Sequence, residues 1–345
     1  MTTPFQTTLA AVAAYLIAIP GIADAQGIPM QRAQRLSAFG ERPAFSPDGS
    51  RVAFVGKAYG DAFEIELDTG YIRNLTGGLP HQGVLRVQYL PNGDYLITGP
   101  RYYSGPNSRI NVDLFVLAKD LQTGLQPLDQ TGFEGVAIGP DNRIAWQQMP
   151  AGEALHEGEK WVEAVGRIHW ENYFGRIVYN DGKPSLVDKR RIMNPPPATC
   201  GQFMEVQDFR DNGREVIFYC GGIIEGKPIM QIFGYNLEDG RYTRYYRTDK
   251  YAEVEGIAPD GTWTTVECGE SPASQGISLI DICRLELVPD GALTPLIIGT
   301  APGTMKKVNN PVVSPDGKVV AFAAGDASVG DHGAGSGIYL LQLGD

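Results

Sequence analysis

The sequence predicts an all-β protein, a six-bladed β-propeller, and three observations support this fold. One unit of strand, Pro-Asp-Gly-like turn and strand recurs six times along the chain. The spacing of these turns is typical of four-stranded propeller blades. The two ends of the chain also carry strands that complete one another, which is how a propeller ring closes.

The repeated unit is clearest in AFSPDGSRVAFV (44–55) and VVSPDGKVVAFA (312–323). Each copy has an apolar strand, a turn rich in Asp, Asn and Gly, and a second strand in which apolar residues alternate. Such turns suit Asp-Gly and Asn-Gly because glycine tolerates positive φ and the Asx side chain bonds nearby backbone groups. The weaker copies are QYLPNGDYLITG (88–99), AIGPDNRIAWQQ (137–148), DFRDNGREVIFY (208–219) and GIAPDGTWTTVE (256–267).

The intervals between the turns set the number of blades. Turn positions 48, 92, 141, 212, 260 and 316 are separated by 44, 49, 71, 48 and 56 residues. Since a four-stranded blade takes about 40–50 residues, the long third interval leaves a seven-bladed ring as the alternative. That interval contains no further Pro-Asp-Gly turn. We therefore predict an insertion at about 150–172 within the third blade, followed by that blade's outer strands at 175–188.

The last blade stops at IYLLQLGD (338–345) without a fourth strand. The segment QRAQRLSAF (31–39), just upstream of the first copy, is predicted to supply it. Pairing of the N- and C-terminal strands closes the ring and removes an exposed sheet edge. Residues 26–345 would then form a single β-propeller domain.

Residues 1–25 have the pattern of a signal peptide. They contain the apolar run LAAVAAYLIAI (9–19), and Ala23, Asp24 and Ala25 give a small-x-small cleavage pattern. The run is too short to span a bilayer. Because this stretch has no Lys or Arg, it favours a eukaryotic secretory signal over a bacterial one. We therefore predict a secreted protein, with a periplasmic location as the alternative.

Composition excludes two classes of partner. The formal net charge is −11 and no basic cluster interrupts it, which argues against nucleic acid and against anionic membrane surfaces. No later apolar run reaches the roughly 18 residues of a membrane span.

Four cysteines in a secreted chain suggest two disulfides, and the spacing favours Cys200–Cys220 and Cys268–Cys283. Each of these pairs brackets a predicted hairpin. Zinc is the competing interpretation, but the sequence has no C-x-x-C spacing and no nearby His pair. Asn74 begins a glycosylation sequon, Asn-Leu-Thr, which would make a secreted eukaryotic chain a glycoprotein.

The SPDG-plus-strand unit resembles the PD40 repeat of TolB-like propellers, which also occurs in the propeller domains of prolyl-oligopeptidase-type enzymes. The resemblance covers the mature chain and implies a fold rather than a reaction. Two phrases, LRVQYLPNGDYLITG (85–99) and YAEVEGIAPDG (251–261), are similar to a fungal and bacterial group of lone secreted propellers. That group includes the propeller protein of fungal trichothecene toxin clusters. This narrower resemblance implies a role in specialised-metabolite biosynthesis or virulence and identifies no catalytic residue.

The repeat also predicts a ring of polar side chains around the central channel. The strand that leads into each turn should be the innermost strand of its blade. Six residues before the Pro-equivalent, the blades carry Glu41, Leu85, Glu134, Glu205, Glu253 and Asn309. Gln207 and Glu255 lie two residues further on and therefore share that face. The position two residues before the Pro is apolar in every blade, and we predict that it packs between neighbouring blades. The residues at this position are Phe45, Tyr89, Ile138, Phe209, Ile257 and Val313.

Polar neighbours extend this ring into a predicted ligand-binding set. Its members are Arg42, His81, Arg86, Glu134, Glu205, Glu253, Glu255 and Asn309. Crowded carboxylates raise one another's pKa, so one Glu can act as a general acid near neutral pH while another stays ionised. The catalytic candidates are Glu134, Glu205 and Glu255. The competing interpretation is a wet polar channel in which Glu–Arg pairs hold the blades together.

The sequence contains no nucleophile elbow, phosphate loop or metalloprotease motif. The first function we predict is the binding of a small oxygenated molecule in the central funnel. Acid–base catalysis there would make the protein a lyase, cyclase or hydrolase without a Ser triad. The alternative is a non-catalytic module whose loops bind a protein or a glycan. No cofactor is predicted, and a divalent cation at the carboxylate ring stays open.

The predicted insertion carries four side chains that fit two roles. They are His156, Trp161, His169 and Trp170. An aromatic and His-bearing loop could cover the channel mouth as a lid. The same aromatic residues could instead pack the insertion onto the edge of its blade.

Overall fold

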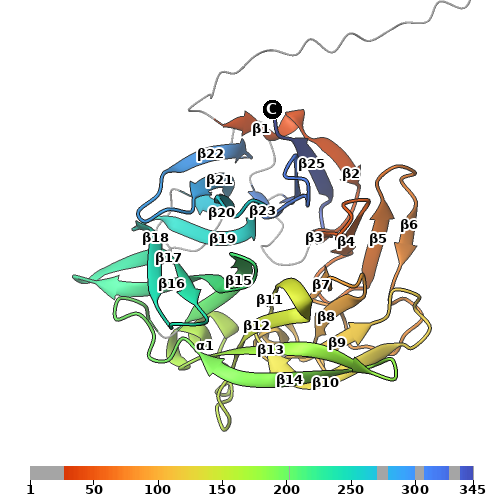
Figure 1. Cartoon of the computed structure of the whole chain (residues 1–345), viewed down its shortest axis with the longest axis horizontal. Coiled ribbons are helices and arrows are strands. Elements are labelled where there is room, and N and C mark those ends of the chain that lie inside the picture. Colours follow the sequence, from red (N-terminus) through yellow and green to blue (C-terminus); the bar gives the residue numbers. More distant parts are fainter. Residues whose placement is uncertain (1–26, 202, 270–278, 300–306, 326–334, 345) are drawn as a thin grey trace, which may run out of the picture.

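Six β-sheets stand in a ring around a common centre, and they are antiparallel except for one short parallel pair in the fifth (Figure 1). This computed structural model describes residues 27–201, 203–269, 279–299, 307–325 and 335–344, apart from the side chains of residues 161 and 162. The predicted six-bladed β-propeller is confirmed. The alternative of seven blades is wrong, because the long third interval belongs to one sheet.

Each of the first three blades is built from consecutive strands. The first contains β3 (Glu41–Phe45), β4 (Arg51–Val55), β5 (Ala62–Glu66) and β6 (Ile72–Asn74). The second contains β7 (Arg86–Tyr89), β8 (Tyr95–Gly99), β9 (Val112–Leu117) and β10 (Leu125–Gly132). The third contains β11 (Val136–Ile138), β12 (Arg143–Gln148), β13 (Glu171–Asn180) and β14 (Lys183–Ile192).

The other three blades follow in order, with N-terminal strands added to the last two. The fourth contains β15 (Met204–Arg210), β16 (Glu215–Ile224), β17 (Lys227–Asn236) and β18 (Tyr242–Thr248). The fifth contains β19 (Tyr251–Ile257), β20 (Trp263–Gly269), β21 (Asp281–Glu286), β22 (Leu293–Ile298) and β1 (Ile28–Pro29). The sixth contains β23 (Lys307–Val313), β24 (Val319–Gly325), β25 (Ile338–Gln342) and β2 (Gln34–Ser37). The helices are η1 (Met30–Arg32), η2 (Pro106–Ile110), η3 (Pro140–Asn142) and α1 (Trp161–Arg167).

The turns after the inner strands have the positive-φ glycines and the Asp hydrogen bonds that the sequence predicts. Gly49 and Gly317 have φ angles of 71° and 74°, a backbone conformation that glycine adopts without a steric cost. Asp48 Oδ1 accepts hydrogen bonds from Ser46 Oγ at 2.6 Å and from the Ser50 backbone N–H at 3.0 Å. These hydrogen bonds lower the pKa of Asp48 to about 2, so the turn is locked by an ionised carboxylate.

Buried apolar side chains fill the interfaces between neighbouring blades. Val87 and Ala53 pack together between the first two blades, and Ala145 and Phe218 pack together between the third and fourth. Burying one such large side chain contributes about 1.5–3 kcal/mol. Because each blade buries one face against each neighbour, the ring as a whole forms the core.

The ring closes as predicted, through a strand from the N-terminal segment. β2 is the outermost strand of the sixth blade, where Gln34 pairs with Leu340 of β25 in antiparallel register. β1 adds in parallel to β22 of the fifth blade, with Ile28 opposite Ile297. The second pairing was not predicted from the sequence, because two residues carry no strand signal. The two pairings fasten the N-terminal segment to two neighbouring blades.

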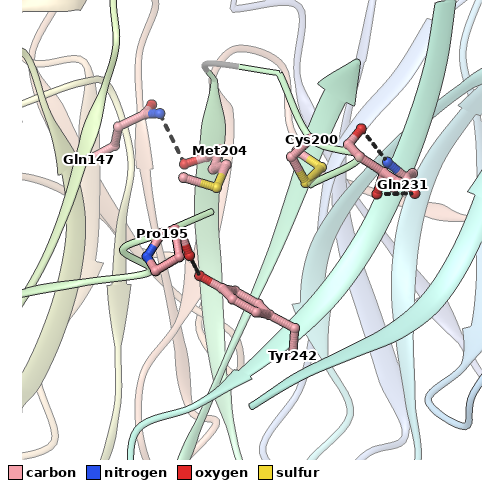
Figure 2. Close-up of a disulfide and its surroundings, with 8 residues drawn as sticks. Gln147, Pro195, Cys200, Met204, Gln231 and Tyr242 are labelled. Carbon is pink, nitrogen blue, oxygen red and sulfur yellow. Dashed lines mark hydrogen bonds between the residues drawn. A yellow bond between two sulfur atoms is a disulfide. The ribbon is translucent and has the colours of Figure 1, made fainter. Parts of the chain in front are cut away.

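Both predicted disulfides are present. Cys200–Cys220 joins the segment before β15 to β16, and Cys268–Cys283 joins β20 to β21. Figure 2 shows the first disulfide with the connection between the third and fourth blades. There Tyr242 donates to the Pro195 carbonyl at 2.8 Å, and Gln231 Nε2 donates to the Thr199 carbonyl at 3.0 Å. Disulfides are typical of proteins in oxidising compartments.

The segment between β12 and β13 holds α1, where an irregular insertion was predicted. Ala164 of this helix and Ile168, which directly follows it, are buried in one cluster with Ile110 of η2. Trp170 is 3% exposed, and its ring centroid lies 5.2 Å from that of Phe133. Trp170 therefore packs, which favours the second of the two predicted roles for the insertion.

His156 and His169 are exposed at the surface of the insertion, and the Trp161 side chain lies outside the described part. Asn74 is exposed, and its Nδ2 donates to Asp61 at 2.8 Å, whereas the Thr76 hydroxyl of the same sequon is buried. The predicted signal peptide lies outside the described residues. Within the described ranges, no helix is both long and apolar enough to cross a membrane.

Candidate functional site

The central channel is lined by the strands that lead into the turns, as predicted. β3 contacts β7 and β23, and β15 contacts β11 and β19, so the inner strands of neighbouring blades lie around the centre of the ring (Figure 1). The channel has two different ends. The Pro-Asp-Gly-like turns surround one, which we name the turn end, and the inner strands begin at the other.

At the end where the inner strands begin, Glu134 lies between two guanidinium groups. Arg42 Nη2 contacts Glu134 Oε1, and Arg109 Nη2 contacts Glu134 Oε2. All three residues are only 6–7% exposed. We name this group the clamp, and its end of the channel the clamp end. Because Arg42, Arg109 and Glu134 come from the first, second and third blades, the clamp joins three blades.

The clamp keeps Glu134 ionised. Burial by itself would raise the pKa of this carboxyl. Arg109, Arg42 and Arg86 outweigh that effect and hold the pKa of Glu134 well below its ordinary value of 4.5. Both carboxylate oxygens are occupied by protein donors, which leaves Glu134 poorly suited to take a proton from a ligand.

Two local features deliver the arginines of the clamp. Arg42 has a φ of 55° at a bulge, where the β3–β4 register shifts between Glu41 and Ala44. Bulges re-aim side chains, and this one sends Arg42 across the channel. Arg109 lies near the end of η2, where Asn107 Nδ2 donates to the Glu159 carbonyl of the insertion at 2.9 Å. The insertion thus supports the helix that carries Arg109.

Glu205 is one of two carboxyls of β15, with Asp208, whose pKa burial raises to about 7. Its Oε2 accepts a hydrogen bond from the Tyr219 hydroxyl at 2.6 Å, and the two residues are opposite one another in the β15–β16 register. Burial first, and then repulsion by Glu134, raises the pKa of Glu205 to about 7. A carboxyl with this pKa can donate or accept a proton near neutral pH.

The fifth blade contributes three further carboxyls, Glu253, Glu255 and Glu267. Burial raises the pKa of Glu253 and of Glu255 well above the usual range, and their like-charged neighbours raise it further. Glu253 accepts a hydrogen bond from the Tyr251 hydroxyl. Glu267 is opposite Glu253 in the β19–β20 register, and its Oε1 accepts from the Asn310 backbone N–H at 2.7 Å. Burial therefore favours the neutral form of Glu253 and of Glu255 over the ionised form.

A cavity of about 460 Å³ opens at the turn end, and all six blades line it. Its polar lining, which lies deepest along the inner strands, includes Arg86, Gln88, Gln207 and Glu255. Its apolar wall, nearer the turns, is Phe45, Tyr89, Ile138, Phe209, Ile257 and Val313. The sequence-based interpretation of this wall as packing alone was incomplete. The same side chains pack between blades and also face the cavity.

The structure brings most of the predicted ligand-binding residues to the channel, but His81 is held by loop residues and does not line the cavity. His81 Nε2 lies 3.1 Å from Asp61 Oδ1, and its Nδ1 accepts from the Gly83 backbone N–H at 3.0 Å, so its contacts are to the loop. Asn309 Nδ2 donates to Asn310 Oδ1 at 2.9 Å. Glu41 contacts Arg42 at 3.4 Å beside the clamp.

Sequence reasoning missed several channel residues. Tyr219 and Glu267 are cross-strand partners of ring carboxylates, so pairing each hairpin about its turn would have found them. Arg109 had no such signal, because a helix in the loop between β8 and β9 carries it.

The side chains of the channel do not fit a divalent cation. Among the described residues, no three His, Cys, Asp or Glu side chains are grouped to hold a metal ion. Both oxygens of Glu134 face guanidinium groups, and Tyr219 and Tyr251 donate to Glu205 and Glu253. The cation that the sequence left open therefore has no set of ligands in this part of the chain.

No protein-family model and no curated protein matches the sequence. Among solved structures, an oligogalacturonate lyase in complex with manganese is 13% identical, with a TM-score of 0.55 over 90% of this chain and 93% of that chain. The oligogalacturonate lyase of Vibrio parahaemolyticus is 11% identical, with a TM-score of 0.54 and the same coverage. TolB from Acinetobacter baumannii is 13% identical, with a TM-score of 0.49 over 89% of this chain and 63% of that chain. At these identities, the two lyase structures show that the fold is shared.

Proposed function

We propose that this propeller is secreted and binds a small oxygenated molecule in its central channel, which the ligand enters from the turn end. The observation that carries the proposal is the cavity of about 460 Å³ lined by all six blades, with polar side chains at its inner end. Ligand sites are concave, largely apolar and supplied with a few convergent polar groups, and their volumes run from about 300 to 1,000 Å³. The cavity has each of these properties.

Glu205 is the residue we assign to acid–base chemistry. Tyr219 holds one of its oxygens, while the other points toward Gly135, where an added Cβ would lie 3.5 Å from both Glu205 Oε1 and Arg86 Nη1. A carboxyl with a pKa of about 7 could protonate a leaving group or remove a proton from a bound ligand. This supports a lyase, cyclase or hydrolase reaction without a Ser nucleophile. Two propellers of similar fold are oligogalacturonate lyases.

The test is a variant that fills the cavity. Ala44 lines it, so Ala44→Phe would occupy the space with a ring, and Ala154→Phe makes the same change on the exposed surface of the insertion. The probes are glycerol, cyclohexanediol and malate, followed by ligand-detected NMR. We expect wild type and A154F to bind at least one probe and A44F to bind none. Retained binding in A44F, or no binding of any probe by wild type, would overturn the proposal.

One feature favours the alternative of a non-catalytic module that binds a glycan or protein through its loops. Tyr102 and Tyr103 are 81% and 50% exposed, and exposed aromatic rings serve as stacking platforms. Such a module would lose its partner on Y102A/Y103A and keep it on A44F. A role in specialised-metabolite biosynthesis or virulence rests only on the phrases at 85–99 and 251–261.

A further inference from the structure

Arg86 differs from Arg42 and Arg109 because it feels the channel carboxyls only from a distance and makes no direct ion pair with a residue that the structure describes. Arg42 and Arg109 both direct a guanidinium at Glu134. Arg86 makes no hydrogen bond or ion pair with any residue that the structure describes, and its Nε, like those of Arg42 and Arg109, is buried without an acceptor. A buried donor that lacks a partner costs about 1–3 kcal/mol, and more when the group is charged. Arg86 also lines the turn-end cavity, where a ligand could satisfy it.

The charge of this side chain limits what can satisfy it. A guanidinium keeps its proton at any physiological pH and offers donors in a planar fork. Carboxylate, sulfonate and phosphate oxygens match that fork in two parallel hydrogen bonds. Of the nearby carboxyls, Glu205 and Glu255 have their pKa raised by burial, which favours their neutral forms, and the ionised Glu134 is held by Arg42 and Arg109.

The wall of the cavity adds a second requirement. Arg86 lies five residues before Pro91 on its inner strand, and the apolar position Tyr89 lies three residues nearer the turn. At about 3.3 Å per residue, the apolar wall stands roughly 10 Å from the level of Arg86. The wall comprises six apolar side chains, one from each blade, and prolines at 47, 91, 140, 259 and 315 surround its outer edge.

We propose that the turn-end cavity takes an amphipathic anion, whose carboxylate or other oxyanion head pairs with Arg86 and whose apolar body packs against the six wall residues. This inference rests on the proposed function, since it names the ligand class of the same cavity. It also assigns Arg86 the role of selecting for charge.

Two probes with nearly the same skeleton test this assignment. Anilinonaphthalene sulfonate carries an oxyanion head, and N-phenylnaphthylamine lacks it. Both fluoresce in apolar sites, so titration gives a dissociation constant for each. Arg86→Met removes the charge and keeps most of the length, and Arg214→Met makes the same change on the outer surface, where Arg214 pairs with Asp211 at 2.6 Å.

We expect wild type and R214M to bind the sulfonate more tightly than the neutral amine. R86M should weaken the sulfonate about tenfold or more and change the amine by less than about twofold. Ile257→Asn, in the wall, should weaken both probes together. Equal loss of both probes in R86M, or no loss of either, would overturn the assignment of Arg86.

The A44F variant separates this inference from the proposed function. If neutral probes bind wild type, fail with A44F and are not displaced by the sulfonate, the amphipathic anion is wrong and the cavity remains a binding site. If no probe distinguishes wild type from A44F, the cavity itself fails as a site, and the inference fails with it.

Discussion

The clamp should be the most sensitive point of the channel to a single isosteric change. Glu134→Gln keeps the shape of the side chain and removes the charge that faces Arg42 and Arg109, all three being 6–7% exposed. Both buried guanidinium groups would then lose the negative charge that they share. Removing one partner of a buried ion pair costs about 3–5 kcal/mol, because an uncompensated charge stays behind.

That free energy can be converted into a melting temperature. At about 2.1 cal/mol/K of unfolding entropy per residue, a propeller of roughly 300 residues shifts by about 1.5 °C per kcal/mol. We therefore expect E134Q to melt about 5–8 °C below wild type, measured by circular dichroism at pH 7. The matched control is Glu153→Gln, whose partner Arg167 lies 3.0 Å away and whose side chain is 42% exposed. A surface pair of this kind contributes about 0–1 kcal/mol.

The pH dependence gives an independent check on the same residue. The clamp holds the pKa of Glu134 below its ordinary 4.5, so the stability it contributes is present above that pH and is lost as the pH falls below it. Wild type should lose stability on acidification below about pH 4.5 more steeply than E134Q. An E134Q protein that melts within 1 °C of wild type, with the same acid slope, would refute the argument that this charge is needed.

Three further predictions concern other parts of the fold. Because burial raises the pKa of Glu205 to about 7, wild type should lose stability as the pH rises from about 4.5 to 7. Glu205→Gln should flatten this pH dependence of the unfolding free energy, measured by urea titration, and a slope identical to that of wild type would contradict the raised pKa. Deletion of residues 1–37 removes β1 and β2 and exposes the edge of β25, so we expect a lower melting temperature and self-association detectable by light scattering. A monomer with an unchanged melting temperature would show that β2 does not close the ring. Replacing Cys268 and Cys283 by Ser should lower the free energy of unfolding by about 2–4 kcal/mol, measured in denaturant. An unchanged free energy of unfolding, together with a different linkage in non-reducing peptide maps of wild type, would contradict the pairing.

The repeat predicted the fold because its signal is local. Each Pro-Asp-Gly-like turn with its flanking strands is encoded within about 12 residues, and six copies fix the blade number once the spacing is known. The closure of the ring was also predictable, since the last blade has one strand too few and a strand stands unused at the N-terminal side. The parallel pairing of β1 was not, because Ile28 and Pro29 alone carry no periodicity.

The positions of several channel residues were predictable from the sequence, but the contacts between their side chains were not. Counting back from the turns placed Glu134, Glu205 and Glu253 at the channel, because the inner strands share one register with their turns. The same count could not show which carboxylate Arg42 meets. The bulge at Arg42, with its φ of 55°, depends on how β3 fits against β4 and sends the side chain to the third blade. Arg109 reaches the same carboxylate from a loop helix, which no repeat position encodes.

The two interpretations of the channel residues belong to opposite ends of it. At the clamp end, Arg42 and Arg109 both pair with Glu134, so that end behaves as a polar contact between blades. At the turn end, Arg86 lines a cavity and makes no hydrogen bond or ion pair with any residue that the structure describes. An arginine that pairs with a protein carboxylate stabilises the ring, whereas an arginine without such a pair can bind a ligand. Glu205 does not line the cavity, but an added Cβ on Gly135 would lie 3.5 Å from both Glu205 Oε1 and Arg86 Nη1. Burial raises the pKa of Glu205 to about 7, whereas the arginines of the clamp hold the pKa of Glu134 below its ordinary value. We therefore expect Glu205→Gln, and not Glu134→Gln, to change proton exchange in the channel near neutral pH.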